Sequence, residues 1–453
     1  MNFNLWALLT DTALMGALML VGQLLRAKLI IFQKLLMPAS LIGGFIGLIL
    51  GPSVLDILPF SSQLASYSGV LIAVVFACMP IGDKLTKKED FKGVGGFFYQ
   101  NTGVAVIQYA AGMTLALLIL NKIWPDLHDG FGLVLATGFY GGHGTAAAVG
   151  NMFADYGWSE FFDLGNVSST VGLVGGIIVG MGIINWGTRK GYTNYVDSPE
   201  ELPQELRTGL IPKEKQNFGG KVTISNMSLD PLVFHLGIVL VATLLGKWSS
   251  DLIKSFVSWL SIPVFVMALI FGYIVQFVLI KTGSVEYVDR HTIQRISGSS
   301  TDLLVVSAVS SLKLDVVVAY FWPLVITFVF GLILNIVWFL WVSKYASSKD
   351  WFERGIMNYG RSNGVVATGV LLNRVVDPDQ KSRGLEDTGI TDLINRPILI
   401  ALQVLPPLFI NFGGRWPVYT TLMMWGLFIV LTIMAIAFKW WTPGKMQGKQ
   451  EVN

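Results

Sequence analysis

Long stretches without a charged residue alternate with short charged loops along the whole chain. Each stretch is near or above the ~20 residues that a helix needs to cross a hydrocarbon core. Their apolar character is continuous rather than alternating, which favours membrane-spanning helices over the strands of a barrel. The pattern therefore predicts an all-α polytopic membrane protein. The uncharged windows are Leu35 to Leu55, Ile57 to Gly82, Gly93 to Asn121, Leu164 to Gly187, Phe256 to Ile280, Val316 to Ser343 and Trp416 to Phe438.

Composition supports a membrane location and narrows the chemistry. Hydrophobic residues form 53% of the 453 positions and charged residues only 13%, about half the charged share of a soluble protein. The N-terminus has no basic segment before its first apolar stretch, so we expect that stretch to be a retained span rather than a cleaved signal. Cys78 is the only cysteine, which excludes a disulfide framework and a cysteine-based metal site.

The distribution of basic residues predicts the topology. If the N-terminus lies outside, alternate loops on the cytoplasmic side hold 25 of the 32 lysines and arginines. Basic residues favour the cytoplasmic face during insertion. We therefore expect about eleven crossings of a plasma (inner) membrane, with the C-terminus in the cytoplasm. The predicted cytoplasmic segments are 26–34, 83–92, 188–230, 281–295, 343–354, 373–387 and 439–453.

Two glycine-rich segments do not fit as crossings. They are Phe131 to Phe153, which contains FYGGHGTAAAVG, and Gly355 to Leu372, which contains NYGRSNGVVATGV. A full crossing at either place would put the following basic loops on the wrong side, and clustered glycines break helices. Both segments are predicted to be re-entrant hairpins, which membranes tolerate only where protein or a watery cavity surrounds them. The first would enter from outside and the second from the cytoplasm.

The two halves of the chain resemble each other. Pro38 and Gly47 superpose on Pro263 and Gly272, and Tyr140-Gly141 superposes on Tyr359-Gly360. Five crossings and one hairpin per half predict two inverted repeats, a layout that places the substrate near the bilayer midplane. Unrelated hydrophobic spans are the alternative. The predicted segments are 1–187 (first repeat, with hairpin 131–153), 188–230 (cytoplasmic linker), 231–414 (second repeat, with hairpin 355–372) and 415–453 (an extra helix and cytoplasmic tail).

The first hairpin carries candidate ligands in the run GGHGT. Glycine lets a ligand approach the backbone groups of a hairpin tip closely, and the hydroxyl of Thr145 is a hard oxygen donor suited to sodium. Tight helix packing is the other explanation for the glycines. His143 either binds substrate or protons, or is satisfied by neighbouring backbone carbonyls.

Polar and charged residues inside the apolar windows are the other candidates. Gln100 and Asn101 must face the protein interior, as sodium ligands or as hydrogen-bonding links between helices. Asp392 either binds a cation or neutralises Arg396, which lies one turn further on the same helix face. Arg361 either receives a substrate carboxylate through its planar fork or pairs with Asp302 or Asp392.

The chain resembles the sodium/glutamate symporters of bacterial inner membranes. The resemblance rests on Gln100-Asn101, on the run Gly141 to Thr145 and on the run Ser169 to Gly176. It implies a homodimeric secondary transporter in membrane lipid, with two inverted five-helix repeats, that uses sodium to drive glutamate uptake. The second hairpin, the long central loop and the extra span after residue 415 depart from the expected pattern.

The resemblance and the residue patterns together give a candidate site. The predicted substrate-binding residues are Gly142, His143, Gly144, Arg361, Ser362, Asn363 and Gly364, and the predicted sodium ligands are Gln100, Asn101, Thr145, Thr170 and Asp392. We expect no cofactor other than sodium as the coupling ion, and no nucleic-acid partner.

Four other functions are the alternatives to this prediction. A carrier with the same architecture that takes protons, or a different carboxylate such as a dicarboxylate, is the closest alternative. An ion channel is the second. An intramembrane hydrolase is disfavoured because the sequence has neither a membrane-embedded G-x-S-x-G nucleophile nor an H-E-x-x-H metal pair, and the lack of a P-loop argues against a primary pump. We therefore predict that the protein is not an enzyme.

Overall fold

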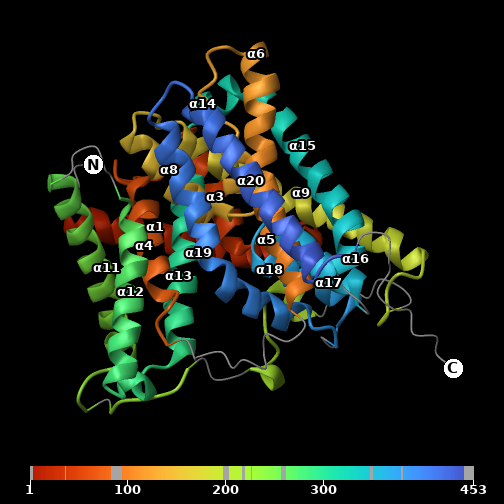
Figure 1. The fold of residues 1–453 in the computed structure, drawn as a ribbon. Coiled ribbons are helices and arrows are strands. Elements are labelled where there is room, and N and C mark those ends of the chain that lie inside the picture. The colour runs from red at the N-terminus through yellow and green to blue at the C-terminus, as the bar shows by residue number, and fades with distance from the viewer. Residues whose placement is uncertain are drawn as a thin grey trace. The chain divides into compact units, whose positions relative to one another are not determined.

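The computed structural model describes residues 4–35, 37–82, 94–196, 204–216, 220–225, 227–256, 262–346, 350–378 and 381–442. Within these ranges every regular element is a helix (Figure 1), which confirms the predicted all-helical class. The predicted cytoplasmic loop 83–92, residues 257–261 of one apolar window and the tail from residue 443 lie outside the described residues.

The helices of the first half precede the central linker. They are α1 (Leu5–Lys28), α2 (Ile30–Lys34), α3 (Ala39–Leu50), α4 (Ser66–Cys78), α5 (Gly95–Leu115), a π-helical turn (Ala116–Leu120), α6 (Asn121–Ile123), α7 (Leu133–Gly138), α8 (Gly142–Asp155) and α9 (Phe161–Arg189). The linker contains α10 (Gln204–Thr208) and a 3-10 turn (Lys213–Lys215).

The helices of the second half follow the linker. It contains α11 (Pro231–Phe256), α12 (Val264–Lys281), a 3-10 turn (Ser284–Tyr287), α13 (Arg290–Ser310), α14 (Leu314–Ala319), α15 (Phe321–Trp338), a π-helical turn (Phe339–Ser343), α16 (Lys344–Ala346), α17 (Trp351–Ser362), α18 (Val366–Val376), α19 (Gly384–Ile410) and α20 (Trp416–Ala437).

Eight helices of the described ranges are long and apolar enough to cross a membrane. They correspond to α1, α5, α9, α11, α12, α15, α19 and α20. The span of α5 continues through its π-helical turn and α6 to Ile123, and the span of α15 continues through its π-helical turn and α16 to Ala346. The other three predicted crossings fall on α3, α4 and α13. Helices α3 and α4 have 12 and 13 residues and reach only about 20 Å at 1.5 Å per residue. The count of eleven crossings therefore stays a prediction.

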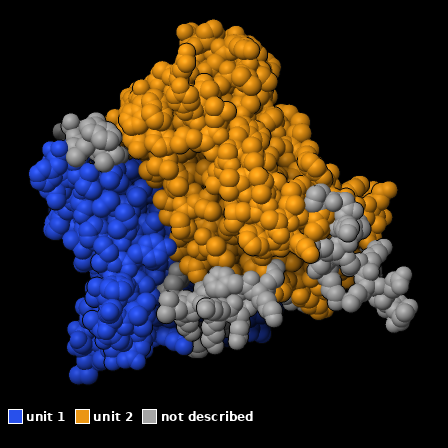
Figure 2. All heavy atoms as spheres, in the orientation of Figure 1, with its two compact units in different colours: residues 1–30, 37–85, 208–313 blue, residues 31–36, 86–207, 314–453 orange. Residues whose placement is uncertain are grey.

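The chain divides into two compact units, and each unit takes segments from both halves of the sequence (Figure 2). Unit 1 comprises residues 1–30, 37–85 and 208–313, with α1, α3, α4, α11, α12 and α13. Unit 2 comprises residues 31–36, 86–207 and 314–453, with α5, α7 to α9 and α14 to α20.

Glycines set the close helix crossings of unit 1. A Cβ atom at Gly47 of α3 would lie 2.1 Å from Oγ of Ser310 in α13, and one at Gly272 of α12 would lie 2.6 Å from the carbonyl oxygen of Ala77 in α4. Small residues allow such approaches in membrane proteins. Helix α3 of the first half thus packs on α13 of the second half, and α12 of the second half packs on α4 of the first half.

Two prolines begin equivalent helices in unit 1. Pro38 precedes α3 with φ −59° and ψ 143°, and Pro263 precedes α12 with φ −59° and ψ 141°. Proline fixes φ near −65° and lacks an N–H donor, so it suits the first position before a helix. The residues that the sequence superposed therefore have the same local structure.

Unit 2 is built around α5, the most buried of the apolar helices. The C-terminal helix α20 packs on it: Nε1 of Trp425 donates to Oγ1 of Thr114 at 2.9 Å, and the hydroxyls of Tyr99 and Thr432 lie 3.0 Å apart. Neighbouring helices enclose α5, so its polar side chains can be hydrogen-bonded inside the protein, where an unpaired polar group would be costly.

The ends of α9 provide a test of topology. Its 29 residues span about 43 Å at 1.5 Å per residue, more than the ~30 Å hydrocarbon core. Ser159 and Lys190 flank the helix and are exposed. In a Cys78→Ser background, we expect a membrane-impermeant maleimide to label Ser159→Cys only from outside and Lys190→Cys only from the cytoplasmic side. Labelling of both from one side would contradict the topology.

Candidate functional site

The GGHGT run forms the start of a helix after a tight turn. Helix α7 ends at Gly138 and α8 begins at Gly142, whose φ of +67° lies in the left-handed region. Residues with a Cβ atom rarely adopt this backbone conformation. We call α7, the turn and α8 hairpin 1. Hairpin 1 overlaps the predicted segment 131–153 and ends two residues later, at Asp155; its re-entrant course stays a prediction.

The second glycine-rich segment forms a matching pair of helices. Helix α17 ends at Ser362, and α18 begins at Val366 after the turn Asn363 to Val365. A Cβ atom at Gly360 would lie 2.7 Å from Cα of Gly369, so the two helices touch next to the turn. We call this pair hairpin 2.

The turns of the two hairpins meet inside unit 2. A Cβ atom at Gly142 would lie 2.8 Å from Cγ1 of Val365 and 3.8 Å from the carbonyl oxygen of Gly364. Asn363 lies against α9: a Cβ atom at Gly176 of α9 would lie 2.5 Å from the Cβ atom of Asn363. Residues about 220 positions apart in the sequence thus form one junction.

Two amides brace the turn of hairpin 2. Nε2 of Gln108 donates to the carbonyl oxygen of Ser362 at 2.8 Å and to Oδ1 of Asn335 at 2.9 Å. Nδ2 of Asn335 donates to Oδ1 of Asn363 at 2.8 Å. All four residues are buried. Gln108 was missed in the sequence, although an amide within an apolar window is a usable signal.

Arg361 is the centre of a buried polar cluster. Its Nη2 lies 2.5 Å from Oδ1 of Asp392, and its Nη1 donates to Oδ1 of Asn101 at 2.7 Å and to the hydroxyl of Tyr140. The Tyr140 hydroxyl donates to Oδ1 of Asn101 at 2.5 Å, and the guanidinium carbon lies 4.7 Å from the Tyr140 ring centre. The cluster joins α5, hairpin 1, α17 and α19.

The partner of Arg361 was an open question in the sequence. Asp392 provides the counter-charge, with Arg361 only 9% exposed and Asp392 26% exposed at the side chain. Tyr140 was not among the predicted site residues, although it directly precedes the glycine run. The structure therefore brings together three predicted residues, Asn101, Arg361 and Asp392.

The remaining predicted residues lie nearby on the same elements. Nε2 of His143 lies 3.0 Å from Oγ1 of Thr170, which in turn donates to a backbone carbonyl of α9. The carbonyl oxygen of Gln100 accepts hydrogen bonds from Trp338 and Asn358 at 3.1 and 3.2 Å. Thr145 is buried and Gly144 half-buried in the first turn of α8.

Several buried polar atoms around the cluster have no hydrogen-bond partner among the described residues. They include Oδ1 of Asn358, Oγ1 of Thr391, Oδ1 of Asn395 and Nε of Arg361. Buried polar atoms are nearly always paired in proteins. The oxygens among these atoms are ligands that suit a hard cation such as sodium. The described residues contain no group of three His, Cys, Asp or Glu side chains that could hold a metal ion.

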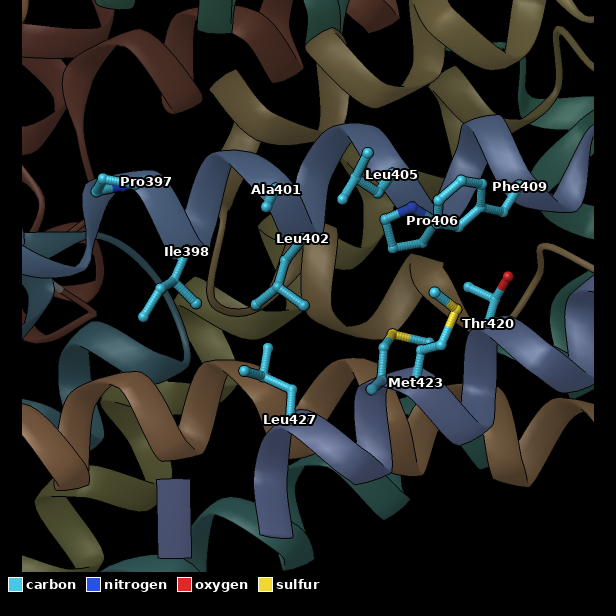
Figure 3. Close-up of a pocket in the computed structure, with 11 residues that line it drawn as sticks. Pro397, Ile398, Ala401, Leu402, Leu405, Pro406, Phe409, Thr420, Met423 and Leu427 are labelled. Atoms are coloured by element: carbon cyan, nitrogen blue, oxygen red, sulfur yellow. The ribbon is translucent and has the colours of Figure 1, made fainter. Parts of the chain in front are cut away.

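An apolar cavity of 340 Å³ lies on another part of α19 (Figure 3). It lies between Pro397 to Phe409 of α19 and Thr420 to Leu427 of α20, and its lining is almost entirely hydrocarbon. A cavity of this kind has no groups to compensate a charged solute for lost water. The polar cluster, rather than this cavity, is therefore the candidate site.

The junction of the two turns can be tested by stability. Gly142 and Gly191 both have φ of +67°, but nothing lies within 4 Å of a Cβ atom at Gly191. Alanine at either position should cost about 1–2 kcal/mol for the left-handed backbone. We expect Gly142→Ala to lower the melting temperature of the purified protein further than Gly191→Ala, because it also pushes Val365 away. Equal losses would contradict the contact between the turns.

Comparison with known proteins shows the family of the chain. The model of the family described as sodium/glutamate symporter matches residues 4–357, and no curated protein matches the chain. The matched region covers α5, hairpin 1 and α9 and ends four residues before Arg361. Since it covers well over half of the 453 residues, the chain belongs to the sodium/glutamate symporter family.

Proposed function

We propose that this protein is a secondary active transporter that couples sodium entry to the uptake of glutamate or a related small anionic amino acid. Family membership makes it a multi-pass membrane transporter rather than an enzyme. The observation that carries the choice of an anionic substrate is the buried guanidinium of Arg361 beside the junction of the two hairpins.

The substrate is proposed to bind at this junction. Arg361 would receive a carboxylate of the substrate, because its fork matches a carboxylate in two-point contact. Helix α8 begins at Gly142, and the free N–H groups of a helix N-terminus attract a negative charge. The other proposed contacts are His143, Gly144, Ser362, Asn363 and Gly364.

Sodium is proposed to bind beside the substrate. Asp392 would supply the negative charge, and Gln100, Asn101, Thr145 and Thr170 would supply neutral oxygens. Asn101 already touches both Arg361 and Asp392, the latter through Nδ2 at 3.5 Å. A single amide thus connects the proposed anion and cation sites.

We also propose that the two halves are inverted repeats with re-entrant hairpins in an inner membrane, and that the protein is a homodimer. The reciprocal packing of α3 on α13 and of α12 on α4 supports a duplicated unit. So does the division of six helices of unit 1 equally between the halves. An odd number of crossings in each half would invert the second copy.

A carrier of another carboxylate is the second candidate. The family match ends at residue 357, so Arg361 and Asp392 lie outside the matched segment. These residues form the charged centre of the site, and a change there alters substrate choice without altering the fold. A dicarboxylate, with sodium or protons as the coupling ion, fits the same guanidinium.

The proposed function is tested by uptake of labelled glutamate into proteoliposomes. An inward sodium gradient should drive accumulation that saturates in both glutamate and sodium, and an equal potassium gradient should not. One sodium per glutamate moves no net charge, whereas a second adds about 2.3 kcal/mol per 100 mV of membrane potential. Two results would favour the second candidate: uptake that does not depend on sodium, or uptake of labelled glutamate that an unlabelled dicarboxylate inhibits far more strongly than unlabelled glutamate does.

The role of Arg361 gives a separate prediction. Lysine keeps the positive charge that Asp392 neutralises, but it contacts a carboxylate at one point rather than two. Arg361→Lys should therefore insert normally and raise the half-saturating substrate concentration at least tenfold, a loss of about 1.4 kcal/mol. Kinetics of uptake at saturating sodium measure this change. An unchanged value would remove Arg361 from the substrate site.

A further inference from the structure

The Arg361–Asp392 ion pair occupies the place where a substrate carboxylate would bind. Nη1 of Arg361 is taken by Asn101 and Tyr140, and Nη2 contacts Asp392. Nε is buried and has no partner among the described residues. The edge formed by Nε and Nη2 is therefore the one with a spare donor, and Asp392 occupies half of it.

We propose that substrate and sodium enter by exchange of this ion pair: the substrate carboxylate replaces Asp392 on the Nε–Nη2 edge of Arg361, and the released Asp392 binds sodium. The inference rests on the proposed function in taking Arg361 as the receptor of the substrate carboxylate. It adds that Asp392 neutralises Arg361 until the two ligands bind.

The surroundings of Asp392 suit a cation once Arg361 has turned to the substrate. Thr391 and Asn395 lie beside Asp392 on α19, and both are fully buried. Their side-chain oxygens have no hydrogen-bond partner among the described residues. Carboxylate, amide and hydroxyl oxygens are the ligands that hard cations take. Asp392 is the more exposed member of the pair.

The exchange couples the two ligands because neither charge can be left alone. Substrate without sodium would take Arg361 from the Asp392 carboxylate and leave it the weaker attraction of Arg396, one turn along α19, and sodium without substrate would strand the Arg361 guanidinium. A buried ion that loses its partner is strongly disfavoured. Together the two ligands keep the site neutral. Each should therefore raise the affinity of the protein for the other by the same factor.

The test removes one charge of the pair at a time in the purified full chain. Glutamate binding is measured in sodium and in potassium, and sodium binding is measured without substrate by thermal stabilisation against potassium. In the wild type, sodium should tighten glutamate binding at least tenfold. Asp392→Asn frees Arg361, so glutamate should bind equally well with and without sodium. Arg361→Gln frees Asp392, so sodium alone should bind at least tenfold tighter than in the wild type.

A second buried ion pair in unit 2 serves as the matched control. Arg354 of α17 pairs with Asp387 of α19, and their side chains are 12% and 1% exposed. Arg354→Gln and Asp387→Asn each break an ion pair between the same two helices, outside the proposed site. They should leave the sodium dependence of glutamate binding as in the wild type.

The outcomes separate this inference from the proposed function. Full sodium dependence in Asp392→Asn, or unchanged sodium binding in Arg361→Gln, would overturn the exchange. If the wild type binds no glutamate, the proposed substrate is wrong, and the sodium arm with Arg361→Gln still decides the exchange. If Arg361→Gln cannot be purified, Arg361→Lys replaces it and must show tighter sodium binding than the wild type, because its single-point contact holds Asp392 less firmly.

Discussion

The neutralisation of one buried guanidinium is the constraint on which the rest of the site depends. An arginine within a membrane costs at least ~2.5 kcal/mol unless a partner or water compensates it. Arg361 meets this requirement with Asp392, Asn101 and Tyr140, which come from α19, α5 and hairpin 1. The charge thus fixes the relative positions of four elements of unit 2.

The turn that carries Arg361 is held by packing as well as by charge. Gln108 and Asn335 bind its backbone and Asn363, and the glycine face of α9 leaves room for Asn363. On the opposite side, Gly142 allows the turn of hairpin 1 to approach Val365. These contacts are short and buried, so they hold the backbone groups at the junction in place. The binding of a charge proposed for this junction would then need little rearrangement.

The apolar windows predicted most of the helices. The glycine runs predicted the two places where a short pair of helices forms, and the re-entrant course of these pairs stays a prediction. The windows did not predict that α3 and α4 are short. The loop between these helices, with Gly51, Pro52 and Pro59, lies largely within windows that have no charged residue. The polar residues of α5 were expected to face the protein interior, and Gln100 and Asn101 do so. Asn358, Asn395 and Tyr140 were not predicted as site residues, because amides and tyrosines are common in such segments and only their neighbours in the fold distinguish them.

The sequence by itself determined that the chain is a helical membrane protein of a known transporter family. Hydrophobic windows and glycine runs are short continuous stretches, so they can be recognised without knowledge of the fold. Only the tertiary structure decided that Arg361 pairs with Asp392, that the two hairpin turns meet, and that each compact unit draws helices from both halves. Asn101 and Asp392 are nearly 300 positions apart. Contacts between such distant residues follow from how whole helices pack, and no local pattern of residues records them.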